Sequence, residues 1–222
     1  MEIIKATGIH KTYNPDKIPV HALRGVDLGI EKGEFTAIVG PSGSGKTTLL
    51  NIIGGLDTPD KGSIIINNTD ISSFKDNEMI NFRRDNIGFV FQAYNLIPVL
   101  TAKENVEFVM VLQNRNLKER TERAEELLNA VDLGDKMDKR PSELSGGQQQ
   151  RVAVARALAS NPTFVLADEP TANLDSTTTA NLLDMMLELN QQEKMTFVFS
   201  THDQRVIDRA RRVITLVDGK IV

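Results

Sequence analysis

Residues 40–47 read Gly40-Pro41-Ser42-Gly43-Ser44-Gly45-Lys46-Thr47 and match the phosphate-binding pattern G-x-x-x-x-G-K-[ST]. Glycines let the backbone curl so that several N–H groups point at one anion, and the helix that follows adds the positive end of its dipole. The lysine supplies a charge for the β- and γ-phosphates, and the threonine hydroxyl is an oxygen ligand of the kind that Mg²⁺ prefers. A chance Gly/Ser turn is the alternative. It fits poorly, because an apolar run precedes the motif and a helical pattern follows it.

Apolar runs on both sides of this loop predict an α/β fold with a helical insertion. We expect strands at residues 3–10, 20–30, 34–39, 63–66, 163–167 and 196–200, and a hairpin at 213–222 around Asp218-Gly219. Helices are expected at 46–53, 148–159 and 177–192. Residues from about 77 to 159 are mostly helical in pattern, with an apolar stripe of Leu117, Ala124, Leu127, Leu128 and Val131. We therefore predict one domain over 1–222, with a core lobe at about 1–86 and 160–222 and a helical lobe at about 87–159.

Composition excludes several classes of function. The net charge of -4 argues against nucleic acid as a partner, because binding duplex phosphates calls for a basic face. The absence of cysteine excludes disulfides, thiolate nucleophiles and cysteine-rich zinc sites. We expect no signal peptide at the N-terminus, and no apolar stretch approaches the roughly 20 residues that span a bilayer.

An apolar strand at 164–167 is followed by two carboxylates, Asp168 and Glu169. Acidic residues often merely mark the end of a strand. Behind a phosphate-binding loop, however, a neighbouring strand is expected to deliver an aspartate to the metal, directly or through water. Glu169, one residue further on, would then orient and deprotonate the attacking water.

A second candidate anion site lies at Leu144-Ser145-Gly146-Gly147-Gln148, where a serine and two glycines precede a long helix. The start of that helix is another site suited to phosphate. One domain with one phosphate-binding loop needs only one such cradle. The second is explained if it faces a nucleotide held by another subunit.

The segment Leu-Ser-Gly-Gly-Gln resembles the signature of ABC ATPases, and the resemblance extends from Ile3 to Val222. It implies a P-loop NTPase of the ABC-cassette fold, with a RecA-like core, an N-terminal antiparallel β lobe and an inserted α-helical lobe. It also implies an ATPase that forms a head-to-tail dimer of two copies. Each ATP would then lie between the phosphate-binding loop of one copy and the signature of the other.

The resemblance assigns further roles by position. It implies that Tyr13 stacks on adenine, that Gln92 touches Mg²⁺ and senses a membrane partner, and that His202 contacts the γ-phosphate. The segment Ala172-Asn173-Leu174-Asp175 resembles the loop that crosses the dimer interface, with Asn173, Leu174 and Asp175 as its interface residues. Taken alone, Tyr13 could be a packing aromatic, Gln92 a strand end and His202 an ordinary polar residue. The full ATP-binding set implied is Tyr13, Gly40, Pro41, Ser42, Gly43, Ser44, Gly45, Lys46, Thr47, Thr48 and Gln92.

The expected active site combines these assignments. Lys46, Glu169 and His202 form the catalytic group, with ATP as substrate. Thr47, Gln92 and Asp168 are the expected contacts of Mg²⁺, and Asp168 could act through water. The signature residues Leu144, Ser145, Gly146, Gly147 and Gln148 would act on the ATP bound by the partner.

Several short segments resemble the lipoprotein-release (LolD) and macrolide-exporter (MacB) branch of the family. They are Gly54-Gly55-Leu56-Asp57, Arg83-Arg84-Asp85 and the stretch from Gln92 to Val106. This implies a separate permease with a large extracytoplasmic domain, which would hold the chain at the cytoplasmic face of the cell (inner) membrane. Ala93 departs from the pattern, since a polar or charged residue is often found there, so details of the transmission loop are expected to differ.

Three other functions within the same family can be compared with the sequence. ABC proteins of the chromosome or DNA-repair type separate the two motifs by long coiled coils, whereas no heptads lie between Gly45 and Ser145. Translation factors of the family normally carry two cassettes, and this chain has one phosphate-binding loop. The third is mechanotransmission, in which the complex controls an enzyme outside the cell without moving a substrate, and the sequence leaves it open.

Overall fold

The computed structural model describes residues 1–222, and its centre is a six-stranded sheet in the order β10-β9-β3-β8-β7-β6. The strands are β3 (Phe35–Val39), β6 (Ile87–Phe91), β7 (Phe164–Asp168), β8 (Thr196–Ser200), β9 (Arg212–Val217) and β10 (Lys220–Ile221). All neighbours are parallel except β10, which pairs with β9 in an antiparallel hairpin. Strands β3, β7 and β8 are almost continuously apolar because both faces of the sheet are covered.

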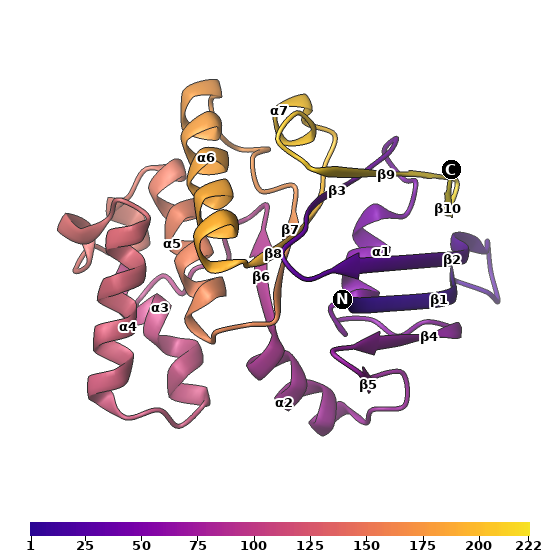
Figure 1. The fold of residues 1–222 in the computed structure, drawn as a ribbon, viewed down its shortest axis with the longest axis horizontal. Helices are drawn as coiled ribbons and strands as arrows, with labels where there is room; N and C mark the ends of the chain where they lie inside the picture. Colours follow the sequence, from indigo (N-terminus) through magenta and orange to yellow (C-terminus); the bar gives the residue numbers. More distant parts are fainter.

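A second sheet of four antiparallel strands stands beside the first, at the right of Figure 1. It contains β1 (Glu2–Tyr13), β2 (Val20–Glu31), β4 (Lys61–Ile66) and β5 (Thr69–Asp70), in the order β2-β1-β4-β5. Every second residue at the end of β4 is buried, so one face of this strand packs against the core. Ile64 and Ile66 lie on that face and belong to the same buried cluster as Ile4 and Ile30.

Helix α1 (Lys46–Ile53) contributes its buried side chains to the core that joins the two sheets. Leu49, Leu50, Ile52 and Ile53 pack there with Ile38 of β3. Helix α2 (Asp76–Asn86) leads from the antiparallel sheet into β6 and has no buried residue of its own. The phosphate-binding loop is therefore fixed at one end to the central sheet and at the other to a buried helix.

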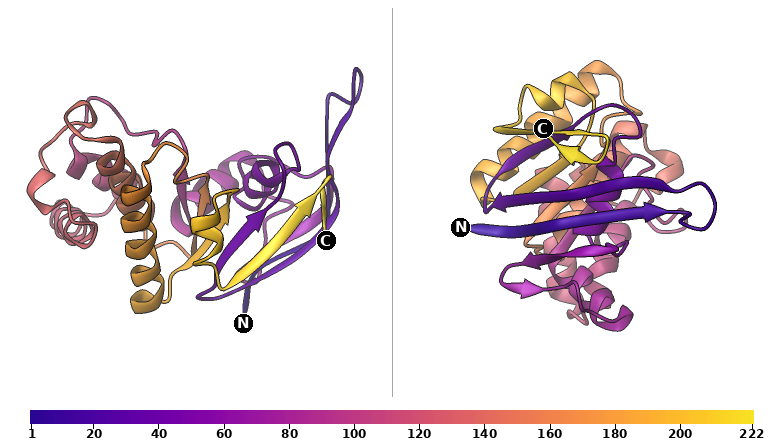
Figure 2. Two further views of the ribbon diagram at one scale, coloured as in Figure 1. Left: turned by 90° about the horizontal axis from the view of Figure 1, so that it is seen from above. Right: turned by 90° about the vertical axis from the view of Figure 1, so that its right-hand side faces the viewer.

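The other face of the central sheet is covered by helices, which lie to the left in Figure 1 and in the left view of Figure 2. They are α3 (Ala102–Leu112), α4 (Leu117–Ala130), α5 (Gly146–Ala159) and α6 (Ser176–Glu193). A second buried cluster joins them to the sheet through Val106, Leu128, Val154 and Leu183. Two short 3-10 turns, Gly134–Lys136 and Pro141–Glu143, link α4 to α5, and α7 (Gln204–Ile207) follows β8.

The α/β architecture predicted from the sequence is confirmed, with two corrections of detail. The expected boundary at about 87 puts residues 87–91 in the helical lobe. Strand β6 instead pairs with β7, so these residues belong to the central sheet. Leu117 was expected in the apolar stripe but is 66% exposed, because it is the first residue of α4 and lies beyond the packed turns. The other four stripe residues are buried.

Parallel strands bring their carboxyl ends to one edge of the central sheet. Val39 of β3, Asp168 of β7 and Ser200 of β8 all end there, and Asp168 is in register with Ser200. The loops that follow these strands carry the phosphate-binding motif, Glu169 and His202. The topology alone therefore gathers residues that are more than 160 positions apart in the sequence.

Candidate active site

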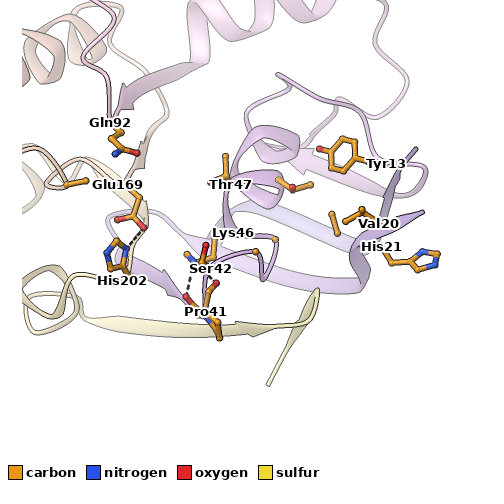
Figure 3. A pocket seen from close by; sticks show the side chains of 16 residues that line it. Tyr13, Val20, His21, Pro41, Ser42, Lys46, Thr47, Gln92, Glu169 and His202 are labelled. Atoms are coloured by element: carbon orange, nitrogen blue, oxygen red, sulfur yellow. Dashed lines mark hydrogen bonds and ion pairs between the residues drawn. The ribbon is translucent and has the colours of Figure 1, made fainter. Parts of the chain in front are cut away.

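The phosphate-binding loop is a tight turn between β3 and α1 (Figure 3). Gly45 precedes the helix at φ +103°, and a Cβ there would overlap the carbonyl oxygen of Ala22. Only glycine satisfies both constraints. Lys46 is 9% exposed, and its Nζ donates to the carbonyl oxygens of Gly40 (2.8 Å) and Pro41 (3.0 Å). The ammonium is thus held inside the curl of the loop, where the backbone N–H groups of the helix start are unpaired.

A cavity of about 730 Å³ opens over this loop. Its walls come from the phosphate-binding loop, the antiparallel sheet, and the segments that follow β6, β7 and β8. The lining residues are Tyr13, Val20, His21, Ala22, Gly40, Pro41, Ser42, Gly43, Gly45, Lys46, Thr47, Thr48, Gln92, Glu169, Ala172 and His202. The volume lies in the range typical of small-molecule sites.

The cavity brings together ten of the eleven residues assigned to ATP from the sequence. Ser44 is the exception, because it is buried beneath the loop and its hydroxyl has no hydrogen-bond partner. A Cβ on Gly40 would lie 2.8 Å from that hydroxyl, so Ser44 supports the loop from behind. Three lining residues have no role expected from the sequence: Val20, His21 and Ala22. Ala172, expected in the interface loop, also lines the cavity. Val20 pairs with Tyr13 across the two strands, a register that the sequence pattern does not specify.

The carboxylates behind the loop form two distinct contacts. Asp168 accepts a hydrogen bond from the Thr47 hydroxyl, with Oδ1 and Oγ1 3.2 Å apart. Burial raises the pKa of Asp168 above its ordinary value, and the nearby charge of Glu169 adds to this, against hydrogen bonds from Ser200 and Thr47 that lower it. A cation beside Asp168 would favour the charged carboxylate and so oppose this increase in its pKa.

Glu169 has an unusual backbone conformation, with φ at +46°. Its N–H donates to the Ser200 carbonyl at 2.9 Å, which ties the residue to the end of β8. Its carboxylate then meets the segment after β8: Oε1 lies 2.7 Å from Nδ1 of His202, and Oε2 accepts from the Thr201 hydroxyl at 3.3 Å. Figure 3 shows the Glu169–His202 pair facing the phosphate-binding loop.

The residues present fit a magnesium ion. Thr47, Asp168 and Gln92 offer only oxygen ligands of the hard kind, and Thr47 and Asp168 are already in contact. No group of three or more His, Asp or Glu side chains gathers anywhere in the chain to form an all-protein metal cage. A few protein oxygens combined with substrate phosphates is the arrangement typical of Mg²⁺ in phosphoryl-transfer sites.

The signature segment lies at the start of α5. This helix begins at Gly146, two residues before the start expected at Gln148. Ser145 caps the helix: its hydroxyl accepts from the Gln148 N–H at 3.3 Å, and the Gln148 side chain accepts from the Ser145 N–H at 2.9 Å. A side chain on Gly147 would collide with Thr178 of α6. None of the five signature residues lines the cavity of its own chain.

The segment Asn173-Leu174-Asp175 connects the site to α6. Asn173 donates through Nδ2 to the Gln92 carbonyl at 2.9 Å. Leu174 packs against the core of the helical layer, and Asp175 caps α6 by accepting from the N–H groups of Thr177 and Thr178. These contacts hold the segment next to Ala172, which lines the cavity.

A family profile described as ABC transporter matches residues 23–172. The chain is an ABC transporter ATPase. An ABC transporter ATP-binding protein of Thermotoga maritima is 46% identical over 220 residues, which cover 99% of this chain and 94% of the relative. The macrolide export ATP-binding/permease protein MacB of Campylobacter jejuni is 49% identical over 200 residues, which cover 90% of this chain but only 31% of MacB.

A solved structure agrees over almost the whole chain. The ATP-binding cassette MJ0796, of Methanocaldococcus jannaschii, has a TM-score of 0.90 and 46% identity, covering 98% of this chain and 96% of its own. That structure is described as a dimeric post-hydrolysis state bound to ADP and Pi. The ABC-cassette fold and the ATP-hydrolysing activity expected from the sequence are confirmed. None of the helices of this ATPase combines the length and hydrophobicity needed to cross a membrane.

Proposed function

We propose that two copies of this ATPase associate head to tail around two ATP molecules. The observation that carries the proposal is the position of the signature, which offers a capped helix start to an anion yet lies outside the cavity of its own chain. A second copy would place Ser145 and Gly147 against the γ-phosphate held by the first. The cassette MJ0796 is described as dimeric in a state bound to ADP and Pi, which supports the formation of a dimer.

Each residue of the cavity then has a role in hydrolysis. The loop N–H groups and Lys46 bind the phosphates, and Tyr13 stacks on adenine. Glu169 orients a water molecule and takes its proton as the water attacks the γ-phosphorus, and the bond to the ADP oxygen breaks. His202, 2.7 Å from Glu169, steadies the γ-phosphate and the water. Mg²⁺, held by Thr47, Gln92 and Asp168, would neutralise charge on the phosphates.

We further propose that the ATPase drives a separate permease of the lipoprotein-release or macrolide-exporter type, with a large extracytoplasmic domain, and is held by it at the cytoplasmic face of the membrane. The MacB relatives, in which an ATP-binding part and a permease share one chain, support this branch. The segment from Gln92 to Asn105 would transmit the motion. Exposed apolar side chains lie in and near it, with Val99 73% exposed and Phe108 41% exposed.

Mechanotransmission is the alternative: the same ATP cycle would control an extracytoplasmic enzyme and transport nothing. The cassette itself would be identical in both cases. The permease distinguishes them, because an external domain that binds a cell-wall hydrolase favours control, and one with an apolar cavity favours lipid handling.

The test is capture of the permease from detergent-solubilised membranes of the native cell, with identification of the retained proteins. Val99→Asp should abolish capture, and Val213→Asp, which changes an exposed valine on β9, should not. A permease with few membrane helices and a large external domain is the expected product. Capture of a many-helix importer, or of no membrane protein, would overturn the proposed branch.

A further inference from the structure

The turn after α1 carries an aspartate to the aromatic ring of the cavity. Gly54-Gly55-Leu56-Asp57 ends the helix, and the N–H groups of Leu56 and Asp57 both donate to the Asn51 carbonyl, which closes the turn. Asp57 Oδ2 thereby lies 2.7 Å from the hydroxyl of Tyr13, which donates to it from the end of β1. These two residues are 44 positions apart and meet only because of this turn.

Lys11 completes the arrangement. Its Nζ lies 2.7 Å from Asp57 Oδ1 and also donates to the Thr58 carbonyl at 2.7 Å. The same ammonium stands over the Tyr13 ring, 5.2 Å from its centroid, at a distance suited to a cation–π contact. The Lys11 side chain is 11% exposed and that of Asp57 26%, so the ion pair is better shielded from water than the surface pairs of this chain.

The charges agree with this geometry. Burial raises the pKa of Tyr13, and the hydrogen bond to Asp57 raises it further, so the phenol keeps its proton and remains a donor. Burial alone would also raise the pKa of Asp57, but the hydrogen bonds from Lys11 and Tyr13 outweigh it, and the pKa lies below its ordinary value. A carboxylate, a phenol and an ammonium therefore hold one another in fixed positions at neutral pH.

We propose that Asp57 and Lys11 are positioning residues that hold the Tyr13 ring in place for the adenine of ATP. Helix α1 and the turn after it then organise both ends of the nucleotide: the helix start carries Lys46 and Thr47 to the phosphates, and the turn carries Asp57 to the residue that receives the base. The inference rests on the proposed stacking of Tyr13 on adenine. Fixing an aromatic side chain before binding removes an ordering cost that corresponds to about twofold to tenfold in affinity.

The experiment compares two ligands, ATP and inorganic tripolyphosphate, by titration calorimetry. Tyr13→Phe and Asp57→Ala should each weaken ATP binding by about twofold to tenfold. The double variant should bind ATP about as tightly as the single variant with the lower affinity, because both changes break the same contact. Tripolyphosphate, which has no base, should bind all of them within twofold of the unchanged protein, whereas a disturbed phosphate-binding loop would weaken both ligands.

Controls separate this inference from the site it rests on. Asp70→Ala, an exposed carboxylate on β5 of the same sheet, should leave both affinities unchanged. Lys46→Ala should abolish binding of both ligands, and if it does not, the proposed nucleotide site itself is wrong. If Asp57→Ala fails to fold, the isosteric Asp57→Asn should show a smaller loss confined to ATP. Three results would overturn the role of Asp57. The folded Asp57 variant could bind ATP as tightly as the unchanged protein, or the double variant could lose the product of the two single losses in ATP affinity. The third is an equal loss of affinity for ATP and for tripolyphosphate.

Discussion

At the residue scale, the proposed chemistry depends on side chains that lie at or just after the ends of β3, β7 and β8. Their proposed roles come from the sequence, because Lys46, Asp168, Glu169 and His202 stand in recognisable positions relative to the glycine motifs. Their geometry does not. The left-handed backbone of Glu169 and its 2.7 Å contact with His202 arise from the register of two strands, which no local pattern reveals.

Glu169→Gln should abolish most ATP hydrolysis and leave ATP binding intact. The amide keeps the shape of the side chain but cannot accept a proton from water, and loss of a general base typically costs about 10²–10⁴-fold in rate. Single-turnover hydrolysis and calorimetric ATP affinity would measure the two effects. A rate within tenfold of the unchanged ATPase would mean that another group takes the proton.

Asp203 should make a pH-dependent contribution to stability. Hydrogen bonds from Arg205 lower its pKa from 3.8 to about 2, with the Thr171 hydroxyl contributing at 2.8 Å. Because the folded-state pKa is depressed, the contribution is complete above about pH 4 and is lost as the pH falls toward 2. The difference corresponds to about 2 kcal/mol, and roughly half of it should be gone at pH 3.

The comparison that checks this is urea unfolding of the ATPase and its Asp203→Asn variant at pH 6 and pH 3. The stability difference between the two proteins should be about 1 kcal/mol smaller at the lower pH. A difference that stays constant would show that Arg205 does not depress the pKa of Asp203.

At the element scale, the apolar pattern located the long helices and strands closely, but it did not reveal the short elements or the pairing of strands. Helix α6 was expected at 177–192 and runs from Ser176 to Glu193. The short elements α7 and β5 and the two 3-10 turns were missed, since they are too brief to show a period. Strand β6 was placed in the wrong lobe because a five-residue apolar run does not say which sheet it joins.

The link between α5 and the segment after Gln92 is an element-scale contact that sequence could not show. Arg156 of α5 donates to the carbonyls of Tyr94 (2.8 Å) and Asn95 (2.5 Å), two consecutive residues with positive φ. No carboxylate lies within ion-pair distance of Arg156 in this structure. Its charge therefore serves the backbone of that segment.

Arg156→Met should lower the free energy of unfolding by about 1–2 kcal/mol, because two carbonyls lose a charged donor. Lys118→Met is the matched control, since it also replaces a cation by methionine. Lys118 is 83% exposed and 3.8 Å from Glu122, and its loss should cost less than about 0.5 kcal/mol. Equal stability of the two variants in urea unfolding would contradict a structural role for the Arg156 contacts.

At the scale of the whole molecule, the proposed dimer requires that the cassette carry halves of two different sites. No residue of the signature lines the cavity over Lys46 in the same chain. The signature forms a capped helix start outside that cavity. The sequence already suggested this, because one chain carries one phosphate-binding loop and a second anion cradle. The structure adds that the two cradles do not share a pocket.

Light scattering of Glu169→Gln, with and without a second change at Ser145, tests the composite site most directly. Aspartate caps helices as well as serine does, so Ser145→Asp should preserve α5 while placing a negative charge against the partner's phosphates. With MgATP, we predict that Glu169→Gln doubles in mass, and that the doubly changed protein binds ATP equally well but stays a monomer. A monomeric Glu169→Gln at saturating ATP, or a double variant that dimerises just as readily, would contradict the account.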